Sequence, residues 1–173
     1  MKVNALPKFI LLLSVLFFVS CDKEEDFVDP DGYEGVDSRL WYFLDAFEQE
    51  AKSRGISVDL RASGLTGRIA NIDGLRVAGG CNFHGSAPNE IILDTTFWST
   101  LSFMQREMIV FHELGHCVLY REHREGAGVA GLCISIMRSG LESCQDGYSE
   151  TTREAYLDEL FMLNLLTKLR LSG

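Results

Sequence analysis

The sequence predicts an α+β domain, because three segments with helical periodicity surround a group of short β-prone segments. Apolar residues recur at helical spacing in residues 38–55, 102–120 and 151–169. Glycine-separated β-prone segments fill most of the chain between the first two of these helices. With 173 residues, 46% of them hydrophobic, the chain is long enough for one globular domain with its own core.

The first twenty residues are predicted to be a secretion signal, separate from the domain. Lys2 and Lys8 accompany an apolar run at residues 9–19, which is too short to span a membrane and has the length of a signal-peptide core. The run leads to Ser20 and Cys21, a pair that resembles the lipobox of bacterial lipoproteins. That resemblance implies that Cys21 is lipidated and anchors the protein to a membrane. The alternative is ordinary secretion with Cys21 as a plain thiol.

Residues 21–37 are predicted to form an acidic, flexible tether that leads into the domain at residues 38–173. The tether contains eight acids and one lysine, together with Pro30, Gly32 and Gly35. It carries most of the net charge of −9, and the domain has no basic stripe, so we expect no nucleic-acid partner. An acidic stretch directly after a lipidated cysteine resembles signals that send lipoproteins to the outer cell surface. The expected location is therefore the outer membrane or the cell surface.

The first half of the domain is predicted to contain one helix and a small sheet. The helix begins at Ser38 and ends at Gly55, and its apolar residues share one face. Four β-prone segments follow, and the last is the clearest because Pro88 and Asn89 precede it. The four segments are residues 56–60, 65–72, 75–78 and 90–94.

The second half is predicted to contain two helices joined by an irregular segment. Ser102 and Gln105 form a capping box that starts a helix through Tyr120. The glycine-rich residues 126–147 are predicted to be irregular. The last helix, residues 151–169, has a broad apolar face that predicts deep burial.

The central helix contains the segment His112-Glu113-Leu114-Gly115-His116, whose spacing favours metal-assisted hydrolysis. Residues four apart on a helix share a face, so His112 and His116 can present two imidazoles to one Zn²⁺ at about 2.0–2.1 Å. Glu113 lies beside the first histidine and can act as general base towards a water that zinc activates. Polar side chains in an apolar helix are costly without partners, which favours a metal site over two structural histidines.

A tetrahedral catalytic zinc site needs a third protein ligand, and His123 is the candidate downstream. It lies seven residues after His116, and Ser135-Ile136-Met137 follows it further along the chain. Together these features resemble the metzincin zinc peptidases, which have the motif His-Glu-x-x-His-x-x-Gly-x-x-His and a methionine-containing turn beneath the metal. The spacing to His123 is one residue longer than in that motif. The motif's glycine is replaced by the residues Leu119, Tyr120 and Arg121.

The resemblance implies a zincin-like fold. A small twisted mixed sheet would pack on the N-terminal helix and the zinc-binding helix, followed by the methionine turn and a C-terminal helix. Met137 would form a hydrophobic floor under the metal. Ile91, Ile92 and Leu93 would lie in an edge strand that pairs with the backbone of an extended substrate.

Other residues compete for two of the roles. The rival third ligand is a glutamate on the last helix, Glu154 or Glu159, as in thermolysin-like zinc peptidases. His84 lies in a glycine-rich loop and is not expected to bind the metal. Several metzincins have a tyrosine two residues after the methionine that stabilises the transition state. This chain has Ser139 there, which leaves Tyr148 as a weak candidate.

Four cysteines besides Cys21 predict two disulfides in an exported protein, with three possible pairings. Cys117 follows a histidine of the metal motif and Cys133 precedes the methionine turn, so a disulfide from either would brace the zinc site. The remaining two are Cys81 and Cys144.

These features predict a membrane-tethered zinc endopeptidase that cleaves peptide or protein substrates. His112, His116 and His123 would bind Zn²⁺, and Glu113 would act as general base and then as acid. The alternative is a zincin-fold surface lipoprotein that binds a partner or a nutrient ligand with little or no hydrolysis.

Overall fold

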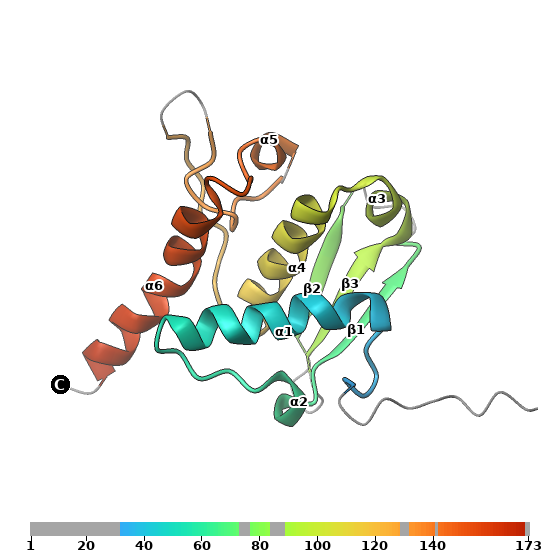
Figure 1. The fold of residues 1–173 in the computed structure, drawn as a ribbon, viewed down its shortest axis with the longest axis horizontal. Coiled ribbons are helices and arrows are strands. Elements are labelled where there is room, and N and C mark those ends of the chain that lie inside the picture. Colours follow the sequence, from blue (N-terminus) through green and yellow to red (C-terminus); the bar gives the residue numbers. More distant parts are fainter. Residues whose placement is uncertain (1–31, 73–76, 84–88, 129–131, 141, 172–173) are drawn as a thin grey trace, which may run out of the picture. The chain divides into compact units, whose positions relative to one another are not determined.

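The computed structural model describes residues 32–72, 77–83, 89–128, 132–140 and 142–171. The predicted signal peptide, Cys21 and the tether up to residue 31 lie outside these residues. Within the described ranges, none of the helices has both the length and the apolar character needed to cross a bilayer. The described residues mix helices with a small three-stranded sheet, as the α+β prediction requires (Figure 1).

Helix α1, Ser38–Ser53, forms where it is predicted. The Asp37 side chain accepts a hydrogen bond from the Arg39 backbone N–H and caps the helix, whose buried face includes Leu40 and Phe47. The domain begins earlier than the predicted boundary at residue 38. Tyr33 and Val36 are buried, and Val36 forms a parallel bridge to Gly67. The acids and glycines around these two residues indicate a linker, but their apolar side chains pack on the core.

The sheet has the strand order β1-β3-β2, with β1 at Thr66–Ala70, β2 at Gly79–Asn82 and β3 at Glu90–Asp94. Strand β3 pairs in parallel with β1 and antiparallel with β2, so β3 is the central strand. The prediction that Ile91, Ile92 and Leu93 lie in a substrate-binding edge strand is therefore wrong. Ile91 and Leu93 are buried and Ile92 is half-buried, which suits a strand inside the sheet.

Two of the predicted β segments differ from the structure. Residues 56–60 form no strand, because the Asp59 side chain accepts from the Ala62 N–H and starts the short helix α2, Leu60–Ser63. Residues 75 and 76 of the next segment lie outside the described residues, and residues 77 and 78 are not in a strand. The strand β2 comes just after them, in a glycine-rich segment that lacks the usual β-forming side chains.

The central helix α4, Phe103–Cys117, follows the short helix α3, Thr95–Thr100. The predicted capping box between Ser102 and Gln105 is present at its start, and the helix ends three residues before Tyr120. Helix α4 packs between α1 and the sheet, on the side of strand β2 (Figure 1).

The chain after α4 contains a short helix α5, Glu142–Gln145, and a long helix α6, Arg153–Leu171. Helix α5 lies within the segment predicted to be irregular. Leu157, Leu160 and Phe161 bury the first turns of α6, while the side chains from residue 163 onwards lie outside those described. The Phe47 ring lies 5.1 Å from both the Phe111 ring and the Phe161 ring, which joins α1, α4 and α6 in one core.

Candidate metal centre

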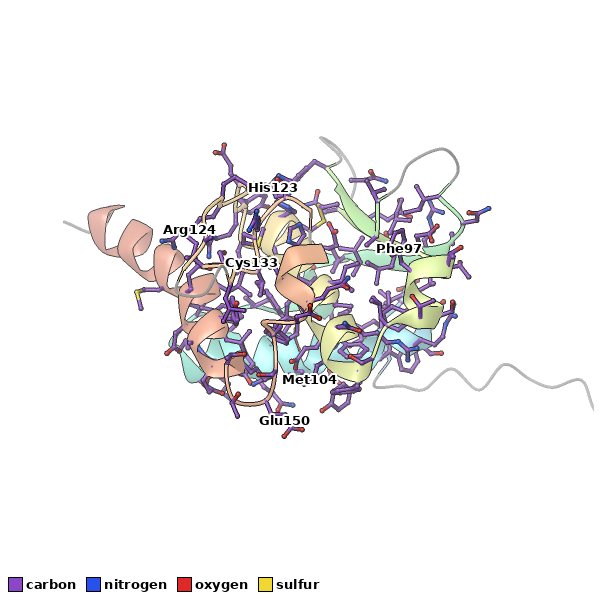
Figure 2. All side chains as sticks on the ribbon, turned by 90° about the horizontal axis from the view of Figure 1, so that it is seen from above. Phe97, Met104, His123, Arg124, Cys133 and Glu150 are labelled. Carbon is purple, nitrogen blue, oxygen red and sulfur yellow. A yellow bond between two sulfur atoms is a disulfide. The ribbon has the colours of Figure 1, made fainter. Side chains whose placement is uncertain are left out.

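Three imidazoles meet beside helix α4. His112 and His116 lie one turn apart on the helix, and their Nε2 atoms are 3.1 Å apart. His123 comes from the segment after the helix, and its Nε2 lies 3.2 Å from Nε2 of His116 (Figure 2). One nitrogen from each histidine falls within 4.8 Å of the other two. The structure thus brings together all three histidines that the sequence singles out.

The hydrogen bonds of the first two imidazoles leave their Nε2 atoms without protons. Nδ1 of His112 donates to the Ile136 carbonyl and Nδ1 of His116 donates to the Arg121 carbonyl, each at 2.6 Å. Two Nε2 lone pairs therefore face each other across 3.1 Å, an arrangement that a shared cation relieves. Tetrahedral ligands at about 2.0–2.1 Å from zinc lie about 3.3 Å apart, close to the spacing found here.

Burial also keeps these imidazoles neutral, as metal ligands must be. It lowers the pKa of His112 to about 4, and it lowers the pKa of His116 as well. Outer hydrogen bonds of the kind that both rings make are typical of metal-ligating histidines, because they set the tautomer and the ring orientation. The donor set and its surroundings therefore fit a zinc ion.

The chain reaches His123 through a turn at Tyr120. Tyr120 has φ 54°, the left-handed conformation, and it is the only non-glycine residue with positive φ in the described part of the chain. The Arg121 N–H donates to the Gly115 carbonyl at 2.9 Å, which folds the chain back against the helix. Tyr120 thus makes this turn in the left-handed conformation, which costs a non-glycine residue about 1–2 kcal/mol.

The Ser135-Ile136-Met137 segment lies directly under helix α4. Met137 is fully buried, and a Cβ added to Gly115 would come within 2.5 Å of its Sδ atom. Glycine at position 115 therefore lets the methionine pack against helix α4. The Met137 carbonyl also accepts from the Arg124 N–H at 2.8 Å, which ties this segment to the one that carries His123.

Glu113 points from the helix towards the start of strand β2. Its side chain is buried, and burial raises the pKa of its carboxyl group to about 8. A cation held by the neighbouring histidines would lower that pKa again. A Cβ on Gly79 would lie 3.0 Å from Oε1 of Glu113, so the glycine allows the strand to approach the carboxylate closely.

A cleft of about 330 Å³ contains His112, Glu113 and His123. The residues that complete its walls come from four segments, and most of them carry no motif that could single them out in the sequence. They are Val77, Ala78 and Gly79 before and in β2, Phe97 in α3, Ser139 and Gly140 after the methionine turn, and Gln145 in α5. Tyr148 is not among them. It is buried and its hydroxyl donates to Glu107, so the structure does not support this weak candidate for stabilising the transition state.

The two rival glutamates have other partners. Glu154 is exposed and forms an ion pair with Arg54 at 2.8 Å. Glu159 accepts from Arg121 and Arg124, each at 2.6 Å, and from the Ser135 hydroxyl. Glu159 therefore joins helix α6 to the segment that carries His123 and to the segment that carries Met137. His84 lies outside the described residues.

Replacing Glu159 with alanine should destabilise the fold without removing the metal ligands. The substitution leaves the buried Arg121 guanidinium without its carboxylate, and we expect a loss of about 2–3 kcal/mol in the free energy of unfolding by urea. Glu154→Ala is the matched control on the same helix, with an expected change within about 0.5 kcal/mol because Glu154 is exposed. Both variants should bind one zinc ion at saturating zinc. A variant that binds none would identify its glutamate as a ligand.

Two disulfides brace the site. Cys81 in β2 pairs with Cys117 at the end of α4, and Cys133 pairs with Cys144 in α5. The first bond holds strand β2 against helix α4. The second closes the segment that contains the methionine turn. This is one of the three pairings that the sequence allows.

Comparisons with known proteins found no relative of this chain. The chain matches no protein-family model, no curated protein and no solved structure. The interpretation of the site therefore rests on its residues and their geometry.

Proposed function

We propose that this protein is a zinc-dependent endopeptidase with a metzincin-like site. The observation that carries the proposal is the convergence of three imidazoles from His112, His116 and His123 above a buried methionine, with Glu113 beside them in one cleft. This combination of ligands, base and open cleft suits metal-assisted hydrolysis of an amide.

His112, His116 and His123 would hold the metal and leave one side open to the cleft. Zinc, when bound, supplies a positive charge that polarises the substrate carbonyl and makes water a stronger acid. The Ile136 and Arg121 carbonyls keep two of the rings oriented for this task. Met137 fills the space under the helix and excludes water from that side.

Glu113 would move the protons of the reaction. Its carboxylate takes a proton from the attacking water and later delivers it to the departing amine nitrogen. Because the carboxylate is buried beside the cleft, it meets little competing solvent. No other carboxylate is among the cleft-lining residues that are described, so this role falls to Glu113 alone.

Strand β2 replaces β3 as the proposed substrate-binding strand. Among the described residues β2 pairs with β3 alone, and no described strand lies along its other edge. Gly79 at its start lies against Glu113 and in the wall of the cleft. An extended peptide could add to this edge as an antiparallel strand, with backbone hydrogen bonds that depend little on side-chain identity.

The export and lipid anchor at Cys21 belong to the same proposal. The two disulfides suit an oxidising compartment outside the cytoplasm. We propose that the peptidase works at the outer membrane or cell surface, tethered by acyl chains on Cys21. Mass spectrometry of Cys21→Ser against the native protein from membranes tests this, because only the native protein should carry the acyl mass.

Metal content and peptide cleavage, measured together, test the proposed function. The purified protein should bind one zinc ion per chain and cleave a broad library of decapeptides. Removal of zinc by a chelator should stop cleavage, and added zinc should restore it. Stoichiometric zinc with no cleavage of any peptide would contradict the peptidase and favour a lipoprotein that binds a partner or nutrient ligand.

Gln145 is proposed to donate a hydrogen bond to the oxyanion of the transition state. Its half-buried side chain lines the cleft, where a neutral amide can serve as donor. Loss of one oxyanion donor typically costs about 10²–10³ in kcat. We expect Gln145→Ala to lower kcat by about 100-fold while KM changes little and zinc content stays the same.

Ser139→Ala is the matched control for Gln145, because it lines the same cleft but its hydroxyl already donates to Glu125. Its kcat should stay within a few fold of the native value. Equal kcat values for Gln145→Ala and the native enzyme would remove Gln145 from the mechanism.

A further inference from the structure

Two large aromatic side chains are exposed next to each other, one after strand β2 and one after helix α4. Phe83 is 59% exposed and Tyr120 is 73% exposed. Their rings stack with centroids 6.3 Å apart and planes 25° apart. Each ring therefore covers part of the other and leaves the rest of its surface open to solvent.

A series of contacts between strand β2 and helix α4 begins at Glu113, the proposed general base, and ends at this aromatic pair. Alternate residues of a strand share a face, so residues 79, 81 and 83 all face helix α4. Gly79 lies against Glu113, Cys81 is bonded to Cys117, and Phe83 stacks on Tyr120. Strand β2 thus runs alongside α4 from the catalytic carboxylate to the aromatic pair. The two ends are four residue steps apart along the strand, or about 13 Å.

Tyr120 destabilises the fold relative to a residue that favours the left-handed conformation. Glycine or asparagine adopts a left-handed conformation with less strain than a bulky aromatic residue does. The ring adds little stability in return, because it is 73% exposed and its stacking partner Phe83 is 59% exposed. When a strained residue beside a functional site has a side chain that adds little to the stability of the fold, that side chain is expected to contact a ligand or substrate.

We propose that Phe83 and Tyr120 form a subsite for a large apolar side chain of the peptide substrate. The inference rests on the proposed function and specifies its substrate class. A peptide antiparallel to β2 has its N-terminal residues near Phe83 and its later residues near Gly79. The subsite therefore takes a residue about three to five positions before the cleaved bond. The aromatic faces suit phenylalanine, tyrosine, tryptophan, leucine or methionine.

Cleavage-site profiling of a randomised decapeptide library tests this subsite. The native enzyme should favour large apolar residues at one position three to five residues before the cleaved bond. In the double variant Phe83→Ser with Tyr120→Asn that preference should vanish, and asparagine should keep the left-handed turn. For two peptides that differ only by phenylalanine or alanine at this position, the ratio of their kcat/KM values should fall about 3- to 10-fold.

The matched control removes a second exposed aromatic pair, whose residues are not among those that line the cleft. Tyr42 on α1 and Phe103 at the start of α4 are 62% and 52% exposed, with ring centroids 5.3 Å apart. Tyr42→Ser with Phe103→Ser should keep the native ratio for the two peptides. A double variant at Phe83 and Tyr120 that also keeps the native ratio overturns the proposal.

An equilibrium binding measurement separates failure of the subsite from failure of the peptidase. Binding of the labelled phenylalanine and alanine peptides is measured by fluorescence anisotropy. The two proteins compared are Glu113→Gln and Glu113→Gln that also carries Phe83→Ser and Tyr120→Asn. Tighter binding of the phenylalanine peptide only when the pair is present supports the subsite, even if the native protein cleaves nothing and the proposed function fails. Equal binding of both peptides to the Glu113→Gln protein that keeps the aromatic pair overturns the subsite. Binding of chitotetraose that depends on the pair, without peptide discrimination, overturns it too.

Discussion

Glu113→Gln is expected to abolish hydrolysis while zinc stays bound. Glutamine has nearly the same shape as glutamate but cannot take a proton from water, and general base catalysis typically contributes about 10²–10⁴ in rate. We therefore expect kcat to fall by at least 100-fold in a continuous assay with a quenched fluorescent peptide. Zinc content, measured by elemental analysis, should remain one per chain because Glu113 is not among the three converging ligands.

The control for this substitution is Glu122→Gln, which removes one negative charge from an exposed position next to His123. Its kcat should stay within a few fold of the native value, because a solvated charge has little effect on the buried site. Native activity in Glu113→Gln would assign the base to another group. Loss of zinc from Glu113→Gln would show that the carboxylate is a ligand, and the proposed mechanism would need a different base.

His123→Ala is expected to weaken zinc binding and to stop hydrolysis. Removing a residue that only orients a ligand typically costs 10–100-fold in metal affinity, and loss of a ligand itself should cost more than about 100-fold. His123 is exposed, so the fold should survive the substitution and the loss can be assigned to the metal. Competition with a chromophoric chelator measures the affinity, and circular dichroism checks the fold.

His84→Ala is the matched control for His123, because it removes the remaining histidine of the chain. It should bind zinc with native affinity. The opposite result would make His84 a ligand and would contradict the proposed donor set. Native affinity in His123→Ala, combined with loss of zinc in Glu159→Ala, would instead support the thermolysin-like alternative.

Much of the site follows from local patterns in the sequence. The spacing of His112 and His116 is sufficient to place their rings side by side, because helix geometry is the same in any surroundings. The capping box at Ser102 likewise acts within one turn and appears as predicted. The apolar run Ile91-Ile92-Leu93 also predicts strand β3 correctly, because its β-prone side chains follow one another in the sequence.

The position of strand β3 in the sheet and the disulfide pairing depend on contacts between distant segments, so local patterns could not predict them. Nothing in residues 90–94 reveals which strands will lie on either side, and the pairing of β3 with β1 and β2 removed it from the sheet edge. The edge strand β2 is rich in glycine, so its strand character comes from the close approach to Leu93 and Glu113 that glycine permits. The Cys81–Cys117 disulfide depends on that same approach.

The altered spacing after His116 shows most clearly what the sequence determines and what the tertiary structure decides. The sequence alone determines that two imidazoles and a carboxylate share one helix, because those relations span less than two turns. Only the tertiary structure decides that His123 joins them. It does so through the left-handed turn at Tyr120 and through Glu159, which holds Arg121 and Ser135 together across three segments. Such a junction depends on packing between residues far apart in the chain, and no local spacing encodes it.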